Sequence, residues 1–199
     1  FNFEAAIKEK DRIVSKTRRN NYVNALRSLK TVTLLEERAR FVSPNEVEVA
    51  GQTYGADKII IAVGASTKVP PIRGLNKVRW LNNITAMQLL KLPESMVIIG
   101  GGPLGMEFAQ MFAHFGTKVT VLIATNQILP KEEPEIAAEL RRCLEEEGLV
   151  IHTNVQVEAV AERNGKKVVT FQKAGSSQDI ESDELLLATG IRPNTSDLG

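Results

Sequence analysis

The sequence has very few of the side chains that crosslink a chain or hold a metal ion. Among its 199 residues there are one cysteine, Cys143, and two histidines, His114 and His152. A single cysteine excludes an internal disulfide framework and fits a reducing compartment. Neither histidine has a second histidine or a cysteine at metal-ligand spacing, so no metal site is expected. The glutamate-rich, amphipathic surroundings of Cys143 favour a half-buried structural thiol.

The sequence also lacks long apolar runs and a strong charge of either sign. No run approaches the roughly 20 apolar residues that span a bilayer, and the start has no signal-peptide pattern. The formal net charge of +1 gives no electrostatic case for nucleic-acid binding. A basic excess in the first 30 residues is better explained as a solvated helix face. We therefore expect a cytoplasmic protein with no membrane or nucleic-acid partner.

What is present is enough apolar material for a core. Hydrophobic residues make up 43% of the chain, which suits one large or two small globular domains. The sequence starts at Phe1 rather than at a methionine, and it breaks off at IRPNTSDLG, just after a strand-like run. We therefore expect that it was cut from a longer protein.

The first part of the sequence predicts a long helix followed by strands. Residues 3–29 place apolar side chains at mixed spacings without proline or glycine, which favours a helix that packs one side on a sheet. Short β-rich runs follow at 31–35, 39–42, 46–49 and 58–63. The run 58–63 is apolar on both alternating faces and ends at Gly64, as expected for a central strand covered on both sides.

Beyond a connector rich in proline and glycine, the pattern changes to alternating strands and helices. A short helical pattern lies within 80–92. Strands are then predicted at 96–99, 118–123 and 149–152, with helices at 103–115 and 134–147. This alternation predicts a parallel sheet with right-handed crossovers. Three more strand-like runs lie at 154–161, 166–172 and 180–188, and Asn164-Gly165 predicts a hairpin between the first two.

A glycine turn stands where the first of these strands meets its helix. Gly100, Gly102 and Gly105 have GxGxxG spacing. The first glycine permits a tight turn, the second lets the backbone approach a pyrophosphate, and the third allows close helix-to-strand packing. The helix N-terminus would then present free N–H groups and a positive dipole end to the phosphates. The segment therefore predicts a dinucleotide-binding site.

The acid that usually binds the ribose of NAD is missing from the sequence. It is expected about 20 residues beyond the first glycine, at the end of the second strand. Ile123 stands there instead, and neither Ala124 nor Thr125 is an arginine that would meet a 2′-phosphate. The choice between NADH and NADPH stays open, with the absence of a repelling carboxylate in favour of NADPH.

Five ordered segments together resemble the pyridine nucleotide-disulfide oxidoreductases, a family that includes mercuric reductase, dihydrolipoamide dehydrogenase and glutathione reductase. They read IIIAVGAST, VPPIRG, VIIGGGPLGMEFA, ILPKEEPEI and LLLATGIRPNT. The resemblance implies an α/β, Rossmann-like FAD/NAD(P)-binding fold with a parallel sheet, crossover helices and an antiparallel β-meander. It also implies a partial FAD-domain segment at 1–75 and an NAD(P)-binding domain at 76–199.

The resemblance implies a role for individual positions. The residues expected to contact NAD(P) are Gly100, Gly101, Gly102, Pro103, Leu104, Gly105, Glu107, Ile123, Ala124, Val155 and Gly190. Those expected to border FAD are Val63, Gly64 and Ala65. Glu107 would position the nicotinamide ring, although an acid near a helix N-terminus is also favoured by the dipole alone. Pro103 replaces the tyrosine that gates the nicotinamide pocket in relatives.

The expected function follows from this resemblance. We expect the chain to position NAD(P)H for hydride transfer to FAD, in an enzyme of the mercuric reductase or dihydrolipoamide dehydrogenase kind that forms a homodimer. The sequence has no paired redox cysteines, no FAD glycine fingerprint and no C-terminal histidine-glutamate pair. It is therefore expected to bind dinucleotide, as a monomer, without completing turnover. A non-catalytic dinucleotide-binding module and an NADH oxidase-type flavoenzyme are the alternatives.

Overall fold

The computed structural model describes residues 2–199. Contacts between residues divide the chain into two compact units. One unit comprises Thr67–Gly190 together with the start of the chain as far as Ile7, and the other comprises Lys8–Ser66 and Ile191–Gly199. The assignment of 1–75 to FAD binding and of 76–199 to NAD(P) binding stays a prediction.

The larger unit is built on a four-stranded parallel sheet in the order β11-β5-β6-β7. Its strands are β5 (Ser95–Ile99), β6 (Lys118–Leu122), β7 (Val150–His152) and β11 (Glu184–Leu187). All three pairings are parallel, as the alternating pattern predicted. Residues Met96–Ile99 of β5 are buried without alternation, because both faces of a parallel sheet are covered.

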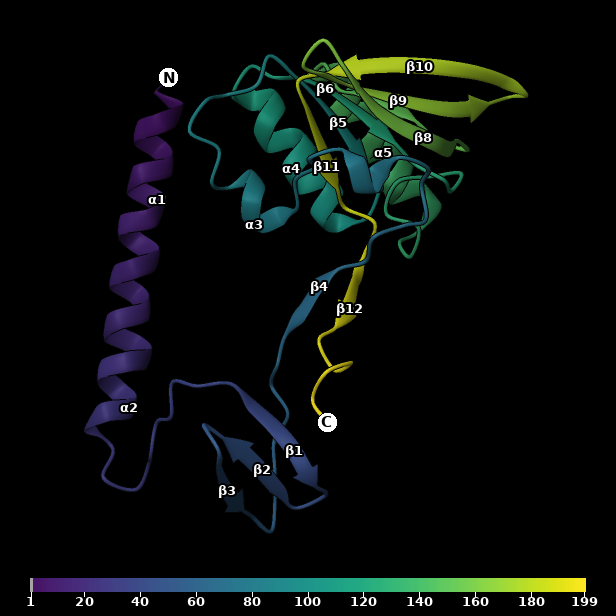
Figure 1. Cartoon of the computed structure of the whole chain (residues 1–199). Coiled ribbons are helices and arrows are strands. Elements are labelled where there is room, and N and C mark those ends of the chain that lie inside the picture. Colours follow the sequence, from purple (N-terminus) through teal and green to yellow (C-terminus); the bar gives the residue numbers. More distant parts are fainter. Residues whose placement is uncertain (1) are drawn as a thin grey trace. The chain divides into compact units, whose positions relative to one another are not determined.

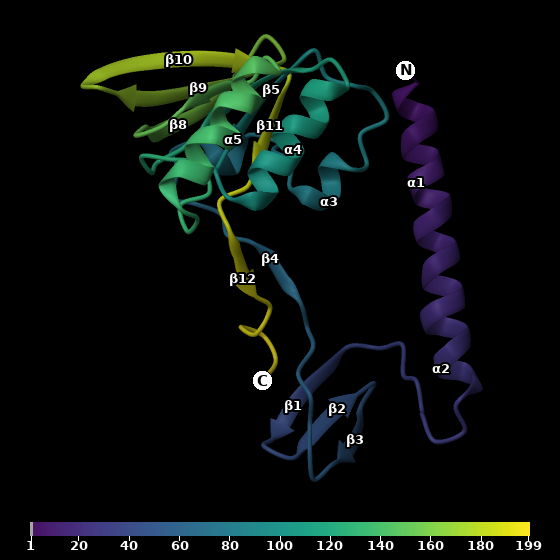
Figure 2. The same cartoon turned by 180° about the vertical axis from the view of Figure 1, so that it is seen from behind.

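Two different layers cover this sheet, as Figures 1 and 2 show. Helices α4 (Pro103–His114) and α5 (Pro134–Glu146) lie on one face. On the other face is an antiparallel sheet of β8 (Gln156–Arg163), β9 (Lys166–Lys173) and β10 (Ser176–Ser182). Alternate residues of the parallel strands therefore enter two separate cores, of which Phe112 and Phe171 are the largest buried members.

The predicted strand 180–188 is two strands that belong to different sheets. Strand β10 ends at Ser182, and β11 begins at Glu184. Asp183 fixes the change of sheet, because its Oδ2 accepts hydrogen bonds of 2.9 Å from both the N–H and the hydroxyl of Ser95. The hairpin at Asn164-Gly165 is confirmed, with positive φ at both residues.

Helical structure in the connector is shorter than the pattern in 80–92 indicated. The connector holds a 3-10 turn, η2 (Leu75–Lys77), and a short helix, α3 (Asn83–Ala86). Asn82 caps α3, since its side chain accepts from two backbone N–H groups and Thr85 reaches back to the Asn82 N–H. Leu81 is fully buried and bridges to the edge of β11.

The predicted N-terminal helix has the expected extent but not the expected packing. It consists of α1 (Phe3–Arg18), a π-helical stretch η1 (Arg19–Asn24) and α2 (Ala25–Ser28). Only Phe3 and Ile7 are buried, so the prediction that it packs along a sheet is wrong. Phe3 instead contacts the rings of Phe112 and Phe115, at centroid distances of 6.3 and 5.6 Å.

The smaller unit contains a three-stranded antiparallel meander. Its strands are β1 (Ala39–Ser43), β2 (Glu46–Val49) and β3 (Gln52–Gly55), and β3 was not predicted from the sequence. A separate pair joins β4 (Ala65–Thr67) to β12 (Ile191–Pro193). The run 31–35 forms no strand, which corrects that prediction.

The predicted central strand 58–63 is also absent. The segment is extended and exposed, with Ile60 92% exposed. No named strand pairs with this segment within residues 2–199, so it is not part of a sheet that could be covered on both faces.

Candidate functional site

An open cavity of about 820 Å³ lies at the carboxyl ends of the parallel strands. Ile99 of β5, Leu122 of β6 and Thr189 just after β11 line it. The remaining lining residues come from the connector, the segment after β6, the stretch from the end of β7 into β8, and the turn at the end of β9: Pro70, Pro71, Ile72, Ala124, Asn154, Val155, Gln156, Val157, Gln172, Ala174 and Gly175. This edge of an open α/β sheet is where ligands bind in doubly wound folds.

The glycine turn adjoins this cavity at the end of β5. Gly100 has φ +123°, and its N–H donates to Leu122 O at 3.0 Å. A Cβ at Gly100 would lie 2.2 Å from Ala188 O, and one at Gly105 would lie 2.2 Å from Gly100 O. Both positions therefore require glycine for the turn itself and for the close approach of α4 to the strand.

Gly101 and Gly102 differ sharply in their surroundings. A Cβ at Gly101 would meet the side chain of Ile123 at 2.6 Å, whereas a Cβ at Gly102 would have no atom within 4 Å. Gly102 is the N-cap of α4, with φ −77°, and Pro103 is the first helical residue. The fold therefore does not explain the glycine at 102, which faces open space.

The N-terminus of α4 offers two backbone donors beside that open space. Pro103 has no N–H, and the first bond within the helix runs from Met106 N–H to Gly102 O. The N–H groups of Leu104 and Gly105 therefore have no partner inside the helix. This is the arrangement that suits an anion such as a pyrophosphate.

Of the residues predicted to contact the ribose and the adenosine, Ala124 and Val155 line the cavity and Ile123 does not. Ala124 is exposed and Val155 is buried, and both line the cavity. Ile123 is buried, and its backbone is already occupied, since its N–H donates to His152 O and its carbonyl accepts from Val155 N–H. Its side chain packs in the core under Gly101, so Ile123 shapes the turn and offers no free group to a ribose.

Two further predicted positions lie at the edges of this region. Glu107 is exposed on α4, in the turn that follows the N-terminal donors. Gly190 has φ +98°, and its carbonyl accepts from the N–H of Lys68 at 2.9 Å. Neither residue lines the cavity, within the part of the chain that the structure describes.

The predicted FAD-bordering residues belong to the other compact unit. Val63, Gly64 and Ala65 are exposed, and Gly64 has φ +70°. Asn194 holds this segment, because its N–H donates to Gly64 O at 3.0 Å and its side-chain amide donates to Val63 O at 3.1 Å. The segment is thus held in a defined, accessible conformation.

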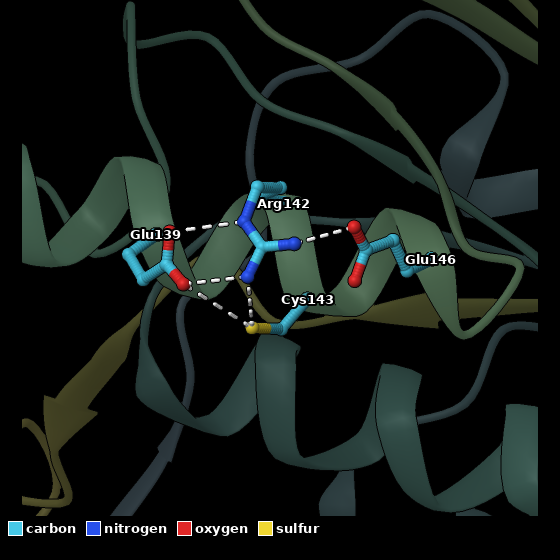
Figure 3. A network of polar contacts seen from close by, with 4 residues as sticks. All are labelled: Glu139, Arg142, Cys143 and Glu146. Atoms are coloured by element: carbon cyan, nitrogen blue, oxygen red, sulfur yellow. Dashed lines mark hydrogen bonds and ion pairs between the residues drawn. The ribbon is translucent and has the colours of Figure 1, made fainter.

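Cys143 lies on α5 among charged side chains. Figure 3 shows the guanidinium of Arg142 between Glu139 and Glu146, with the thiol of Cys143 beside it. The sulfur is 3.8 Å from Arg142 Nη2 and 4.0 Å from Glu139 Oε1. Hydrogen bonds to Glu139 and Glu146 raise the pKa of Arg142, which binds both acids as a surface network. No second thiol exists in the sequence to pair with Cys143.

One polar pair near the cavity did not emerge from the sequence. Lys173 Nζ lies 2.8 Å from His152 Nδ1, and the imidazole stacks near Phe171. Burial, followed by the charges of Lys173 and Arg141, lowers the pKa of His152 and so favours its neutral ring. Because an ammonium can only donate, Nδ1 is the acceptor of this hydrogen bond. The residues are 21 positions apart, on strands of different sheets, and no local motif links them.

Within residues 2–199, no three His, Cys, Asp or Glu side chains are placed to hold a metal ion. Over the same residues, every helix is too short or too polar to cross a membrane.

Known proteins match this arrangement over nearly the whole chain. Mercuric reductase of Lysinibacillus sphaericus is 35% identical over 192 residues, which cover 96% of this chain and 35% of that protein. Dihydrolipoyl dehydrogenase of Geobacillus stearothermophilus is 35% identical over 173 residues, which cover 84% of this chain and 36% of that protein.

A solved structure shares the fold. The HOCl-induced flavoprotein disulfide reductase RclA from Escherichia coli superposes with a TM-score of 0.90 at 32% identity, covering 100% of this chain and 45% of that chain. The chain thus spans between about a third and a half of the length of these relatives. Residues 3–198 match the family described as pyridine nucleotide-disulphide oxidoreductase. The chain therefore belongs to the pyridine nucleotide-disulfide oxidoreductase family.

Proposed function

We propose that this chain binds NAD(P)H across the carboxyl ends of its parallel strands and positions the nicotinamide for hydride transfer to FAD. The observation that carries the proposal is the contrast among the four turn glycines. Gly100, Gly101 and Gly105 are glycine because protein atoms crowd them, whereas Gly102 has no atom within 4 Å of its added Cβ. Open space beside the donors of a helix N-terminus fits a pyrophosphate that approaches the backbone.

The adenosine end of the dinucleotide would lie along the cavity. Ala124 and Val155 line it, and Ala124 is exposed where the ribose of a Rossmann ligand is expected. The buried Ile123 acts indirectly, by supporting Gly101. The proposal therefore places the ribose against the backbone and side chains that follow Ile123, rather than against Ile123 itself.

The nicotinamide end would lie toward Glu107 and Gly190. Glu107 is exposed on the first turns of α4 and is proposed to orient the nicotinamide carboxamide. Val63, Gly64 and Ala65 are proposed to border FAD, since they are exposed and fixed by Asn194. When bound, FAD would supply the hydride acceptor. A dithiol step would need a pair of cysteines, and this sequence has only Cys143.

The whole protein's activity is proposed from its relatives. We propose an oxidoreductase of the mercuric reductase or dihydrolipoyl dehydrogenase kind, homodimeric and cytoplasmic. The support is the similarity to those two enzymes, at 35% identity in each case, and the scarcity of cysteine, which fits a reducing compartment.

Titration calorimetry of the 199-residue chain with NADH and NADPH tests the dinucleotide site. We expect at least one of them to bind with one-to-one stoichiometry. Absence of binding by both nucleotides, with the chain shown to be folded by circular dichroism, would contradict the proposed function.

A further inference from the structure

A half-buried ammonium group is held beside the dinucleotide cavity without a carboxylate partner. Lys173 is the last residue of β9, and its Nζ contacts His152 Nδ1 at 2.8 Å. Within residues 2–199, no carboxylate oxygen lies within 4.0 Å of this ammonium. An ammonium has three donor protons, and one contact to a neutral imidazole leaves two of them for another acceptor.

A second cation lies close to this pair. Arg141 on α5 donates to the carbonyl of Ile151 at 3.2 Å and reaches Thr153 Oγ1 at 3.4 Å. Its Nε is paired with Glu145, so it is partly neutralised and structurally anchored. Arg141 therefore contributes positive potential near His152 while Lys173 keeps its free donors. Half-buried, unpaired positive charge of this kind favours an anion.

The pair lies beside the cavity, although neither Lys173 nor His152 is one of its lining residues. Both chain neighbours of Lys173, Gln172 and Ala174, line the cavity. His152 lies directly opposite Leu122 in the register of the parallel sheet, and Leu122 lines the cavity as well. Strand β6 ends at Leu122, two residues before the exposed Ala124, so the pair borders the region where a Rossmann fold holds the ribose of adenosine.

We propose that Lys173, positioned by His152, binds the 2′-phosphate of NADPH and makes this chain prefer NADPH to NADH. The inference rests on the proposed function, because it assigns a phosphate to the same dinucleotide site. A phosphate monoester brings close to two negative charges and three acceptor oxygens, whereas the 2′-hydroxyl of NADH brings no charge. No carboxylate occupies positions 123–125 to repel that phosphate.

His152 has a positioning role in this arrangement. Its Nδ1 accepts a hydrogen bond from the ammonium and so restricts a long, flexible side chain to one direction. A glutamine in its place would keep an acceptor, whereas a phenylalanine would remove it. We therefore expect His152→Phe to weaken NADPH binding more than His152→Gln does.

The test is a comparison of binding constants across variants, measured by calorimetry at a fixed, low salt concentration. For the unmodified chain we expect NADPH to bind about tenfold or more tightly than NADH, as a charge-assisted hydrogen bond allows. The probe 2′,5′-ADP should likewise bind more tightly than 5′-AMP. Lys173→Gln should abolish both preferences and leave NADH binding within about twofold, while Lys173→Arg retains them.

A matched control is available at the opposite end of β6 in the parallel sheet. Lys118, the first residue of β6, is exposed, and Lys118→Gln removes the same charge far along the strand from Ala124. This variant should keep the full preference for NADPH. Circular dichroism of each variant establishes that it is folded.

The inference and the proposed function fail in different ways. Equal binding of NADH and NADPH by the unmodified chain, or an unchanged preference in Lys173→Gln, would overturn the role of Lys173 and leave the dinucleotide site standing. Equal loss of NADH and NADPH binding in Lys173→Gln would also overturn it, because that pattern indicates a general effect on the cavity. Binding of neither nucleotide by the unmodified chain would overturn both.

Discussion

The side chain of Ile123 fills the space in front of Gly101, so that a Cβ added at Gly101 would lie 2.6 Å from Ile123 Cδ1 and 2.8 Å from Cγ2. Ile123 is 2% exposed, and its branched side chain has no room to withdraw. The strand residue that replaces the expected ribose acid thus explains one glycine of the turn. The neighbouring Gly102 has no such explanation inside the fold.

Replacing Gly101 by alanine should destabilise the larger unit. We expect Gly101→Ala to lower the free energy of unfolding by about 2 kcal/mol through overpacking against Ile123. Urea unfolding followed by Trp80 fluorescence measures this, with Gly102→Ala as the control that loses no more than about 1 kcal/mol, the cost of alanine at an N-cap. In a double-mutant cycle, Ile123→Ala should relieve part of the cost. Independent effects of the two substitutions would show that Ile123 is not the obstacle.

Replacing Gly102 by alanine should affect the ligand rather than the fold. A Cβ at this position meets no protein atom, but it would enter the space proposed for the pyrophosphate. We expect Gly102→Ala to weaken binding of NADH and NADPH about tenfold or more, measured by calorimetry. Gly55→Ala, on the meander strand β3, serves as the control with unchanged binding. An unaltered affinity in Gly102→Ala would mean that the turn has a structural role only.

The stability of the larger unit should fall in acid because of Asp183. The hydrogen bond from Lys166, followed by those from Ser95, lowers the pKa of Asp183 in the folded chain. A lowered folded pKa gives stabilisation that is complete above the unfolded pKa of about 3.9 and is lost as the pH falls through the folded pKa. Asp183→Asn should therefore cost most stability near pH 7 and progressively less below about pH 4.

Urea unfolding at pH values from 7 down to 3, followed by Trp80, measures the Asp183 contribution. Asp57→Asn is the matched control, since Asp57 is an exposed aspartate in a loop, and its variant should follow the unmodified chain throughout. A constant difference between Asp183→Asn and the unmodified chain over this range would refute the linkage.

The adjacent Glu184 should have the opposite effect. Burial raises its pKa, and its Oε2 is buried without a hydrogen-bond partner among residues 2–199. Ionised Glu184 therefore costs stability at neutral pH, and the cost disappears as the pH falls through the raised pKa. We expect Glu184→Gln to stabilise the chain by about 1 kcal/mol at pH 7, with a smaller gain at pH 4. Glu181→Gln, at an exposed site on β10, should be neutral, and a destabilised Glu184→Gln would disprove the interpretation.

The sequence by itself determined the features that depend on residues close to one another along the chain. The alternation of strands and helices from 96 to 152, the glycine turn and the Asn164-Gly165 hairpin are encoded by local periodicity and by backbone preferences, and the structure contains each of them. The family was also indicated by such local segments, and residues 3–198 match it.

Only the tertiary structure decided which apolar runs are buried and which distant residues meet. The runs 58–63 and 95–99 have similar apolar patterns, yet β5 is paired on both edges and buried, while 58–63 is unpaired and exposed. The packing of helices and of a second sheet on the parallel strands buries Ile123 and brings His152 of β7 to Lys173 of β9. Local sequence restricts backbone angles, whereas strand partners and facing side chains come from segments far away in the chain, which no local pattern specifies.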